Sequence, residues 1–314
     1  MQDSATMFDR PLDGLSWPKW LAAIPDQLGP KGYAVPLGPQ HAAIFVEKGS
    51  TLLVSFEAHH RIEDVSDNGH PLGWQMVKTL GWSHLCLASE TDTWFRDGRV
   101  YAYFDRLIDS GFFDGFDTVI FYGAGPCGYA AAAFSVAAPG ARVLTLQPQA
   151  TLDPRVTEWD DRYIAMRRTA FDDRYGYAPD MLDAAQSAFV LYDPEIELDA
   201  MHAALFTRSN VTKFRMRHLG MRIDASLTRM NLLLRMLAQL SADKLTRASL
   251  ARLYRARRDD GAYQFNLLKH TTRDDRHKLT QWLAKSVLER RDSPPFRKAL
   301  ARANNELAAQ QNAK

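Results

Sequence analysis

Residues 118–149 read TVIFYGAGPCGYAAAAFSVAAPGARVLTLQPQ, and this stretch decides the fold of the chain. Residues 118–122 are apolar, β-branched or aromatic, which predicts a short buried strand. A glycine turn follows at residues 123–128, and the alanine-rich residues 129–136 predict a helix. Residues 142–146 are again apolar and predict a second strand. The stretch is therefore a βαβ unit whose turn lies at the carboxyl end of a strand, where ligands bind in open α/β sheets.

Composition is that of an ordinary globular protein. The 314 residues, 46% hydrophobic and 24% charged, can bury one large core or two domains. The longest apolar run falls well short of the roughly 20 residues of a membrane helix, and residues 1–13 lack a secretory-signal pattern. Two cysteines, Cys86 and Cys127, form no disulfide framework and no metal-ligand motif. We therefore expect a cytoplasmic protein with no membrane span and no metal site.

The net charge of +2 is unevenly distributed along the chain. Residues 241–314 contain 17 Lys and Arg against 8 Asp and Glu, whereas the preceding 240 residues contain 22 against 29. The plain interpretation of this basic segment is a solvated helical surface. The alternative is a docking surface for an acidic protein partner; we do not expect nucleic acid as a partner.

Strand and helix patterns alternate through the middle of the chain, which predicts a doubly wound, mostly parallel sheet covered on both faces. We expect residues 1–34 to form an irregular, proline-rich wrap, residues 35–240 to form the α/β domain, and residues 241–314 to form a basic helical extension. Residues 41–47 and 51–57 are expected to be strands joined by a hairpin-like turn. The other strands expected outside the central unit are residues 83–88, 188–192 and 211–216.

One interpretation of the glycine turn is a dinucleotide-binding fingerprint. Gly123, Gly125 and Gly128 match G-x-G-x-x-G directly after a strand, and the turn resembles the GAGPxG of flavin- and nicotinamide-binding Rossmann domains. That resemblance implies FAD or NAD(P) as cofactor and an oxidoreductase. Against it, the second strand ends at Gln147 instead of an acidic residue, and several strands precede the turn.

The second interpretation is a nucleophile elbow. The segment FYGAGPCGYAAAAFS resembles the F-Y-G-x-S-x-G-G-Y-x-A elbow of the α/β-hydrolase superfamily, over roughly residues 40–240. The resemblance places the acid at Asp193 and the histidine at His218, in the family's chain order. It implies that Phe56, Glu57, Gly125 and Pro126 line the cleft. Trp94, in the loop after residues 83–88, is a further lining candidate, although its plain interpretation is a packed aromatic.

This elbow departs from the family pattern at two positions. Gly125 occupies the nucleophile position and has no side chain to react. Pro126 follows it and has no backbone N–H for the oxyanion. Two independent parts of the hydrolase mechanism are missing. We therefore predict a degenerate hydrolase, a pseudoenzyme that keeps a cleft for a small molecule or a partner.

The alternative enzyme depends on Cys127, which lies in the first turn of the predicted helix. If the helix dipole lowers its pKa, Cys127 could be the nucleophile, with His218 as base and Asp193 orienting the histidine. The protein would then be an ester or thioester hydrolase or an acyltransferase. The plain interpretation of Cys127 is a small buried side chain.

Overall fold

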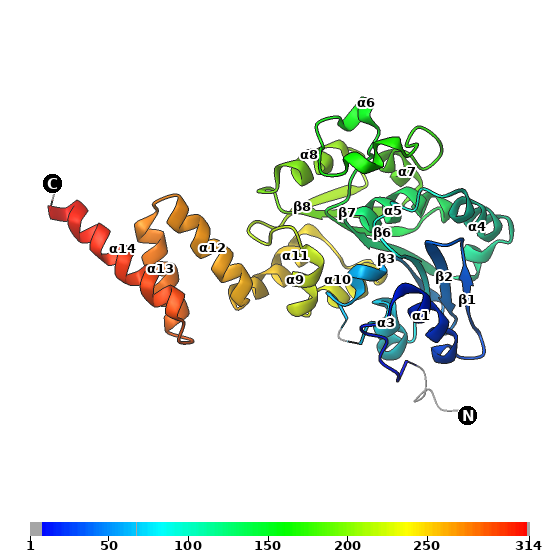
Figure 1. Ribbon diagram of the computed structural model, residues 1–314, viewed down its shortest axis with the longest axis horizontal. Helices are drawn as coiled ribbons and strands as arrows, with labels where there is room; N and C mark the ends of the chain where they lie inside the picture. Colours follow the sequence, from blue (N-terminus) through cyan, green and yellow to red (C-terminus); the bar gives the residue numbers. More distant parts are fainter. Residues whose placement is uncertain (1–7, 67, 313–314) are drawn as a thin grey trace.

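The computed structural model describes residues 8–66 and 68–312. Its centre is one sheet of eight strands in the order β1-β2-β4-β3-β5-β6-β7-β8. Figure 1 shows this sheet with helices packed around it. The strands run parallel from β4 across to β8, whereas β2 is antiparallel to both of its neighbours. The strands are β1 (Gly32–Pro36), β2 (His41–Val46), β3 (Thr51–Ala58), β4 (Ser83–Ser89), β5 (Thr118–Ala124), β6 (Arg142–Leu146), β7 (Ser187–Tyr192) and β8 (Val211–Arg215).

The hairpin predicted between β2 and β3 is wrong, because β4 lies between these two strands and pairs with both. Ser83, the first residue of β4, bonds to the turn between β2 and β3 and so places β4 between these strands. The hydroxyl of Ser83 accepts hydrogen bonds from the backbone N–H groups of Lys48 (2.9 Å) and Gly49 (3.1 Å). It also donates to the carbonyl of Gly49. The predicted hairpin turn is therefore held open by the strand that separates its two arms.

Helices cover both faces of the sheet, as predicted. The helices are α1 (Trp17–Ala23), α2 (His59–Ile62), α3 (Gly73–Leu80), α4 (Gly98–Asp109), α5 (Pro126–Phe134), α6 (Pro154–Thr157), α7 (Ala178–Met181), α8 (Glu197–Leu205), α9 (Ile223–Arg229), α10 (Leu233–Ser241), α11 (Arg247–Leu253), α12 (Gly261–Arg273), α13 (His277–Leu288) and α14 (Pro294–Asn312). Short 3-10 turns are η1 (Pro25–Gln27), η2 (Phe112–Gly115), η3 (Ser135–Ala137), η4 (Ile164–Arg168), η5 (Leu182–Ala184) and η6 (Tyr254–Arg258).

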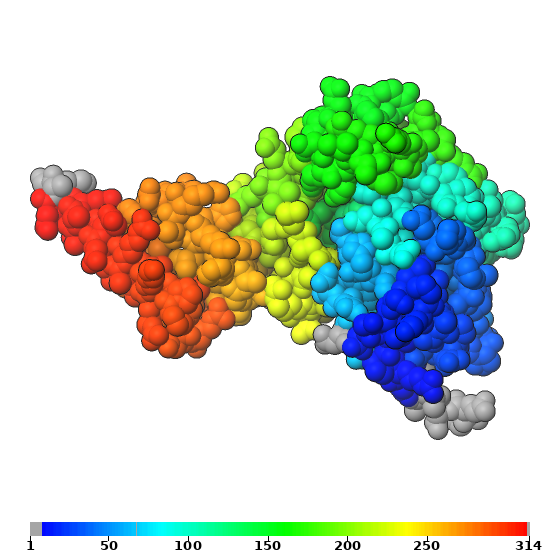
Figure 2. Space-filling view, in the orientation of Figure 1, coloured from blue at the N-terminus to red at the C-terminus, as the bar shows by residue number. Residues whose placement is uncertain are grey.

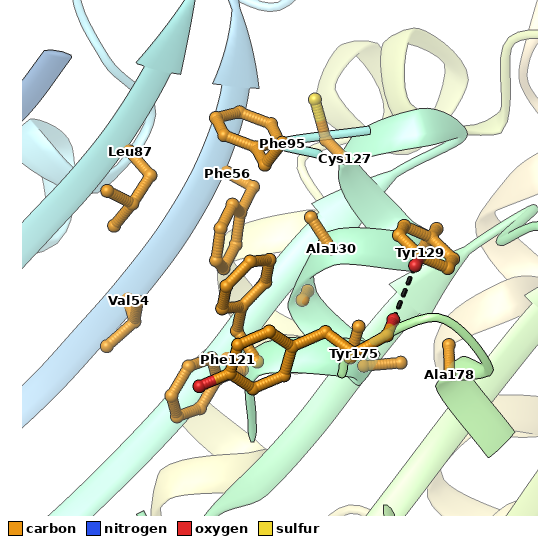
Figure 3. Close-up of a cluster of buried hydrophobic side chains, with 14 of the residues drawn as sticks. Val54, Phe56, Leu87, Phe95, Phe121, Cys127, Tyr129, Ala130, Tyr175 and Ala178 are labelled. Carbon is orange, nitrogen blue, oxygen red and sulfur yellow. Dashed lines mark hydrogen bonds between the residues drawn. The ribbon is translucent and has the colours of Figure 1, made fainter. Parts of the chain in front are cut away.

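Alternate residues of each central strand pack on opposite faces, as the pleat requires. Val54 and Phe121 join a cluster with α4, α5 and α7, whereas Leu53 and Ile120 join a second cluster with α3, α9, α10 and α11. Figure 3 shows part of the first cluster, in which the hydroxyl of Tyr129 donates to the carbonyl of Tyr175. Every residue of α5 is buried, so its alanines let the helix lie close to β3, β5 and β6.

The described part of the N-terminal segment contains the helix α1 and the first residues of β1. Trp17 and Trp20 of α1 are buried and stack on each other with ring centroids 5.8 Å apart. Residues 32–34, at the end of the expected wrap, belong to β1, which pairs with β2 and extends the sheet. Residues 1–7 of the expected wrap lie outside the described residues.

The C-terminal helices divide between the body and a projecting lobe. Leu245, Leu250 and Tyr254 are buried in the same cluster as β6, so α11 and η6 pack on the body. Helices α12 to α14 extend away from it (Figures 1 and 2) and have a small core of their own, formed by Leu268, Ala284, Val287 and Phe296. The basic helical segment predicted from residue 241 therefore begins on the body and continues beyond it.

The sheet and the turn after its fifth strand identify the fold. β5 ends at Ala124, α5 begins at Pro126, and Gly125 alone forms the turn between them. A strand–turn–helix elbow in the middle of a mostly parallel, eight-stranded sheet is the α/β-hydrolase fold, which confirms the predicted fold class. Among the helices of residues 8–66 and 68–312, none has both the length and the apolar content needed to cross a bilayer.

Candidate functional site

The backbone of the elbow is built by glycines. Gly125 has φ 57° and ψ −124°, a conformation that residues with a side chain rarely adopt. Its N–H donates to the carbonyl of Leu146 on β6 at 2.7 Å. A Cβ on Gly123 would lie 2.1 Å from the carbonyl oxygen of Cys127, so only glycine lets β5 and α5 approach this closely. The backbone of the elbow is therefore intact, although the residue at its nucleophile position has no side chain.

An arginine lies above this empty position. Nη1 of Arg61 is 3.3 Å from the place that a Cβ of Gly125 would occupy. Nη2 of Arg61 donates to Oδ2 of Asp92 at 2.7 Å, which holds the guanidinium in place. No motif in the sequence marks Arg61. Arg61 could be found only from its place in the fold, because α2 follows directly on β3, the strand next to β5.

Two adjoining cavities surround the elbow, and Arg61, Ala124 and Asp224 line both of them. The smaller has a volume of about 30 Å³ and includes three predicted residues, Phe56, Glu57 and Cys127, the first two as cleft-lining residues. The larger has a volume of about 100 Å³ and is lined mainly by polar groups: Gly125, Gln147, Gln149, Arg162, Tyr163, Asp199, Met221 and Arg222. Phe56 and Glu57 therefore line the smaller cavity, and Gly125 lines the larger one.

The remaining predicted cleft residues are packed beneath it. Trp94 is 1% exposed, donates from Nε1 to Gln149 Oε1 at 3.1 Å, and contacts Tyr163 edge to face. It therefore supports the wall of the larger cavity through these two residues. Pro126 is buried at the first position of α5, where its missing N–H costs no helical hydrogen bond.

The polar wall of the larger cavity is cross-linked. Gln147 donates from Nε2 to Asp199 at 2.7 Å and accepts from the backbone N–H of Ile223 at 3.1 Å. Arg162 donates to Asp199 at 2.6 Å and to Asp160 at 2.8 Å. Each group is held by a partner from a different segment, so the cavity is formed in advance of any ligand.

The structure does not assemble the triad expected for a cysteine enzyme. Asp193 is buried and uses its two carboxylate oxygens to accept the N–H groups of Glu195 (3.0 Å) and Gly220 (2.8 Å). His218 instead directs Nδ1 at the carboxylate of Glu195, at 3.0 Å. Within the part of the chain that the structure describes, neither Asp193 nor Cys127 forms a hydrogen bond with the His218 ring.

Cys127 has the environment of a core residue. It is 5% exposed and belongs to the buried cluster that includes Phe56 and Phe95, as Figure 3 shows. Burial raises the pKa of the Cys127 thiol well above its usual range. This direction is opposite to the lowering that the cysteine-enzyme alternative requires.

The glycine turn also offers little to a dinucleotide. The N–H of Gly125 is already bonded to Leu146, and Pro126 has none to offer. Gln147, which takes the place of the acidic ribose ligand, is bonded to Asp199. Gly123 and Gly128 serve the close packing of strand and helix, and Gly125 supplies the positive φ of the turn.

A buried polar network lies behind the smaller cavity. The hydroxyl of Ser55 donates to Glu57 Oε1 at 2.6 Å and therefore accepts from Nε2 of His84, at 2.8 Å. The carboxylate of Glu57 also accepts from the N–H of Leu72. Burial raises the pKa of Glu57 and lowers the pKa of His84 to about 3. Sequence spacing gave no sign of this network, because its members come from two different strands, β3 and β4.

Known proteins resemble this chain in structure and not in sequence. Neither a protein family nor a curated protein matches it. Est1E from Butyrivibrio proteoclasticus is 13% identical, with 67% of this chain and 98% of that one covered at a TM-score of 0.41. MPT51 from Mycobacterium tuberculosis is 13% identical, with 68% and 96% covered at 0.42. A hyperthermophilic esterase from Pyrobaculum calidifontis is 14% identical, with 71% and 86% covered at 0.42.

Proposed function

We propose that this α/β-hydrolase fold is a binding protein without serine-hydrolase chemistry, whose elbow cleft holds a small polar molecule. One observation carries the proposal: the guanidinium of Arg61 lies 3.3 Å from the Cβ position of Gly125, where a nucleophile would begin. The site thus has a fixed cation in place of a reactive oxygen.

The missing N–H of Pro126 supports the same conclusion independently. Loss of one oxyanion donor alone costs about 10²- to 10³-fold in the turnover of a serine hydrolase. Here the donor and the nucleophile are both absent, and the guanidinium of Arg61 is paired with Asp92. A return of the serine mechanism would require at least two simultaneous substitutions.

The lining of the larger cavity indicates the chemistry of the ligand. Arg61 and Arg162 offer N–H donors, Asp224 offers acceptors, and Gln147 and Tyr163 add neutral polar groups. Most of these groups already have partners within the protein, so a ligand must use their remaining donor and acceptor positions. A volume of about 100 Å³ is below the usual range of ligand pockets. We therefore expect a ligand of a few non-hydrogen atoms, or one polar group of a larger molecule.

Ligand binding and hydrolysis can be tested on the same full-length chain. We expect no labelling by a fluorophosphonate probe and no turnover of a short-chain acyl ester. We expect a panel of small carboxylates, amides and polyols to contain a compound that raises the Tm. Arg61→Met should abolish that shift, whereas Arg252→Met on the exposed side of α11 should preserve it. Ester turnover or fluorophosphonate labelling of the parent chain would overturn the proposal.

A second proposed function concerns the projecting helices, which we infer dock onto an acidic protein surface. Trp282 is 56% exposed on α13, and the ammonium group of Lys278 lies 5.3 Å from its ring centroid. Phe265 of α12 is also exposed. An exposed aromatic side chain beside a cation, on a lobe that leaves the body, supports a docking role.

Binding to a poly-glutamate peptide tests this second function. The full chain should bind the peptide in a salt-dependent manner, and the double variant Lys278→Glu/Trp282→Ala should bind much more weakly. Lys31→Glu, which changes the same charge on the body, is the matched control. Equal binding by both variants would contradict the docking role, and stronger binding of a DNA duplex would replace the acidic protein by nucleic acid.

A further inference from the structure

Three potential metal ligands converge where the projecting helices meet the body. Glu195 follows β7, His218 follows β8, and His270 lies on α12. Nδ1 of His218 is 3.0 Å from the Glu195 carboxylate, and Nε2 of His270 is 2.9 Å from Oε2 of the same residue. One ligand atom from each residue lies within 4.8 Å of the other two, and the histidine ring centroids are 4.7 Å apart.

These separations are close to those of a metal centre. Bonds of about 2.0–2.1 Å in a tetrahedral site place neighbouring ligand atoms about 3.3 Å apart. Both histidine–glutamate distances are within a few tenths of an ångström of that value. Two imidazoles and one carboxylate are a donor set that Zn²⁺ and neighbouring divalent transition metals accept. The three side chains keep partial exposure of 18–28%, so an ion can enter and keep a water ligand.

The backbone around the cluster holds the ligands in position. The buried carboxylate of Asp193 bonds the N–H of Glu195 and the N–H of Gly220, and so joins the loop of Glu195 to the loop of His218. His218 has φ 67°, a strained conformation for a residue with a side chain. The amide of Asn266 on α12 donates to the carbonyl of His218 at 3.1 Å, which anchors the third element. Supporting contacts of this kind are typical of metal sites.

We propose that Glu195, His218 and His270 bind one divalent transition-metal ion, with water in the fourth position, and that the ion fastens α12 to the body. Nδ1 of His218 and Nε2 of His270 become the ligand atoms, and the ring proton of each moves to its other nitrogen. At His270 that nitrogen, Nδ1, now lies 3.3 Å from Nη2 of Arg273. The Arg273 side chain is 69% exposed, so it can turn to solvent and keep its bond to Asp274.

The site is separate from the elbow cleft, and this inference does not depend on the proposed function. The metal site assigns new roles to His218 and Asp193, which were first considered as members of a catalytic triad. His218 is a ligand, and Asp193 is a positioning residue that sets the spacing of two ligand loops.

Titration of the metal-free full-length chain with Zn²⁺ and with Co²⁺ tests the proposal. We expect one ion per chain, and a visible Co²⁺ spectrum of the strong, tetrahedral type. His218→Ala and His270→Ala should each weaken binding by about 100-fold or more, since even the supporting contacts of a metal ligand contribute 10- to 100-fold. His277→Ala, a histidine at the start of α13, is the matched control and should bind as the parent does.

Two outcomes would overturn the proposal. One is an absence of Zn²⁺ and Co²⁺ binding to the parent chain. The other is binding that survives in His218→Ala and His270→Ala, which would place the ion elsewhere. Folding of each variant is checked by its unfolding transition without metal. If the ion fastens α12 to the body, Zn²⁺ should slow tryptic cleavage between the body and the lobe in the parent chain and in His277→Ala. It should not slow this cleavage in His270→Ala.

Discussion

The guanidinium of Arg61 lies against Gly125 at the elbow, with Nη1 3.3 Å from the position that a Cβ of this glycine would occupy. Gly125 keeps φ 57° and ψ −124°, so the elbow retains the strained backbone although it carries no reactive group. Such strain costs about 1–3 kcal/mol for a residue with a side chain, and glycine largely avoids it.

The first prediction is that Gly125→Ser does not create a hydrolase. Pro126 still provides no N–H, and the new hydroxyl would begin against Arg61. We expect no fluorophosphonate labelling, and a loss of about 1–3 kcal/mol in the free energy of unfolding, measured by urea denaturation. Adding Arg61→Ala should recover part of that loss, because it removes the contact.

Gly140→Ser is the control for this prediction, since Gly140 also has positive φ (84°) but no atom within 4 Å of its Cβ position. It should lose stability through backbone strain alone, and Arg61→Ala should not restore it. Labelling of the Gly125→Ser chain by the probe would show that the elbow needs only a hydroxyl to react.

The second prediction concerns the thiols. Cys86 and Cys127 are buried, and burial raises the pKa of both. The thiols of the native chain should therefore react with a thiol reagent at pH 8 only at the rate at which the protein unfolds and exposes them. In denaturant both thiols should react at once. Ser286→Cys, on the exposed side of α13, provides a fast-reacting control. Rapid labelling of native Cys127 would revive the cysteine enzyme.

The sequence predicts the fold well where the signals are local. The β-branched and aromatic run of β5, the alanines of α5 and the proline at its start each specify structure within a few residues. The order of β2, β3 and β4 could not be predicted in this way. A short turn favours a hairpin, and only the distant Ser83 contacts to Lys48 and Gly49 separate the strands.

The site is predicted only where the elbow motif marks it. Gly125 and Pro126 stand out because they replace residues with known roles, whereas Arg61 has no motif and reaches the elbow through the fold. The cluster of Glu195, His218 and His270 depends on how α12 lies against the body, and its members are up to 75 residues apart in sequence. Spacing along the chain cannot reveal such a site.

The third prediction is a dependence of stability on pH that arises at His84. Burial lowers the pKa of His84 to about 3 in the folded protein, against about 6.5 when unfolded. Between these values the unfolded chain binds more protons, so the free energy of unfolding should fall as pH falls from about 6.5 toward 3. In NMR titrations the His84 ring should not change protonation between pH 8 and 4 in the folded protein, and should titrate normally in urea. A folded His84 that titrates near pH 6.5 would contradict the buried, neutral state.

The last prediction concerns Asp260, which joins the body to the projecting helices. It accepts the N–H of Tyr263 at 2.7 Å as the N-cap of α12, and it bonds Nε of Arg229 on α9 at 2.8 Å. Burial alone would raise the pKa of Asp260, but the hydrogen bonds and charge of Arg229 and the backbone N–H of Tyr263 together outweigh it, and the pKa is lowered. The stabilisation from this carboxylate should therefore be present above its ordinary pKa near 3.9 and be lost as pH falls through the lowered value.

Two substitutions separate the cap from the ion pair. Asp260→Asn keeps an acceptor for Tyr263 and loses the ion pair, whereas Asp260→Ala loses both. We expect Asp260→Ala to destabilise α12 by about 1 kcal/mol more than Asp260→Asn does, measured by hydrogen exchange of its first turn. Asp259→Ala removes only an exposed pair with Arg290 and should have little effect. Equal exchange in all three variants would mean that α12 is held to the body by its apolar contacts alone.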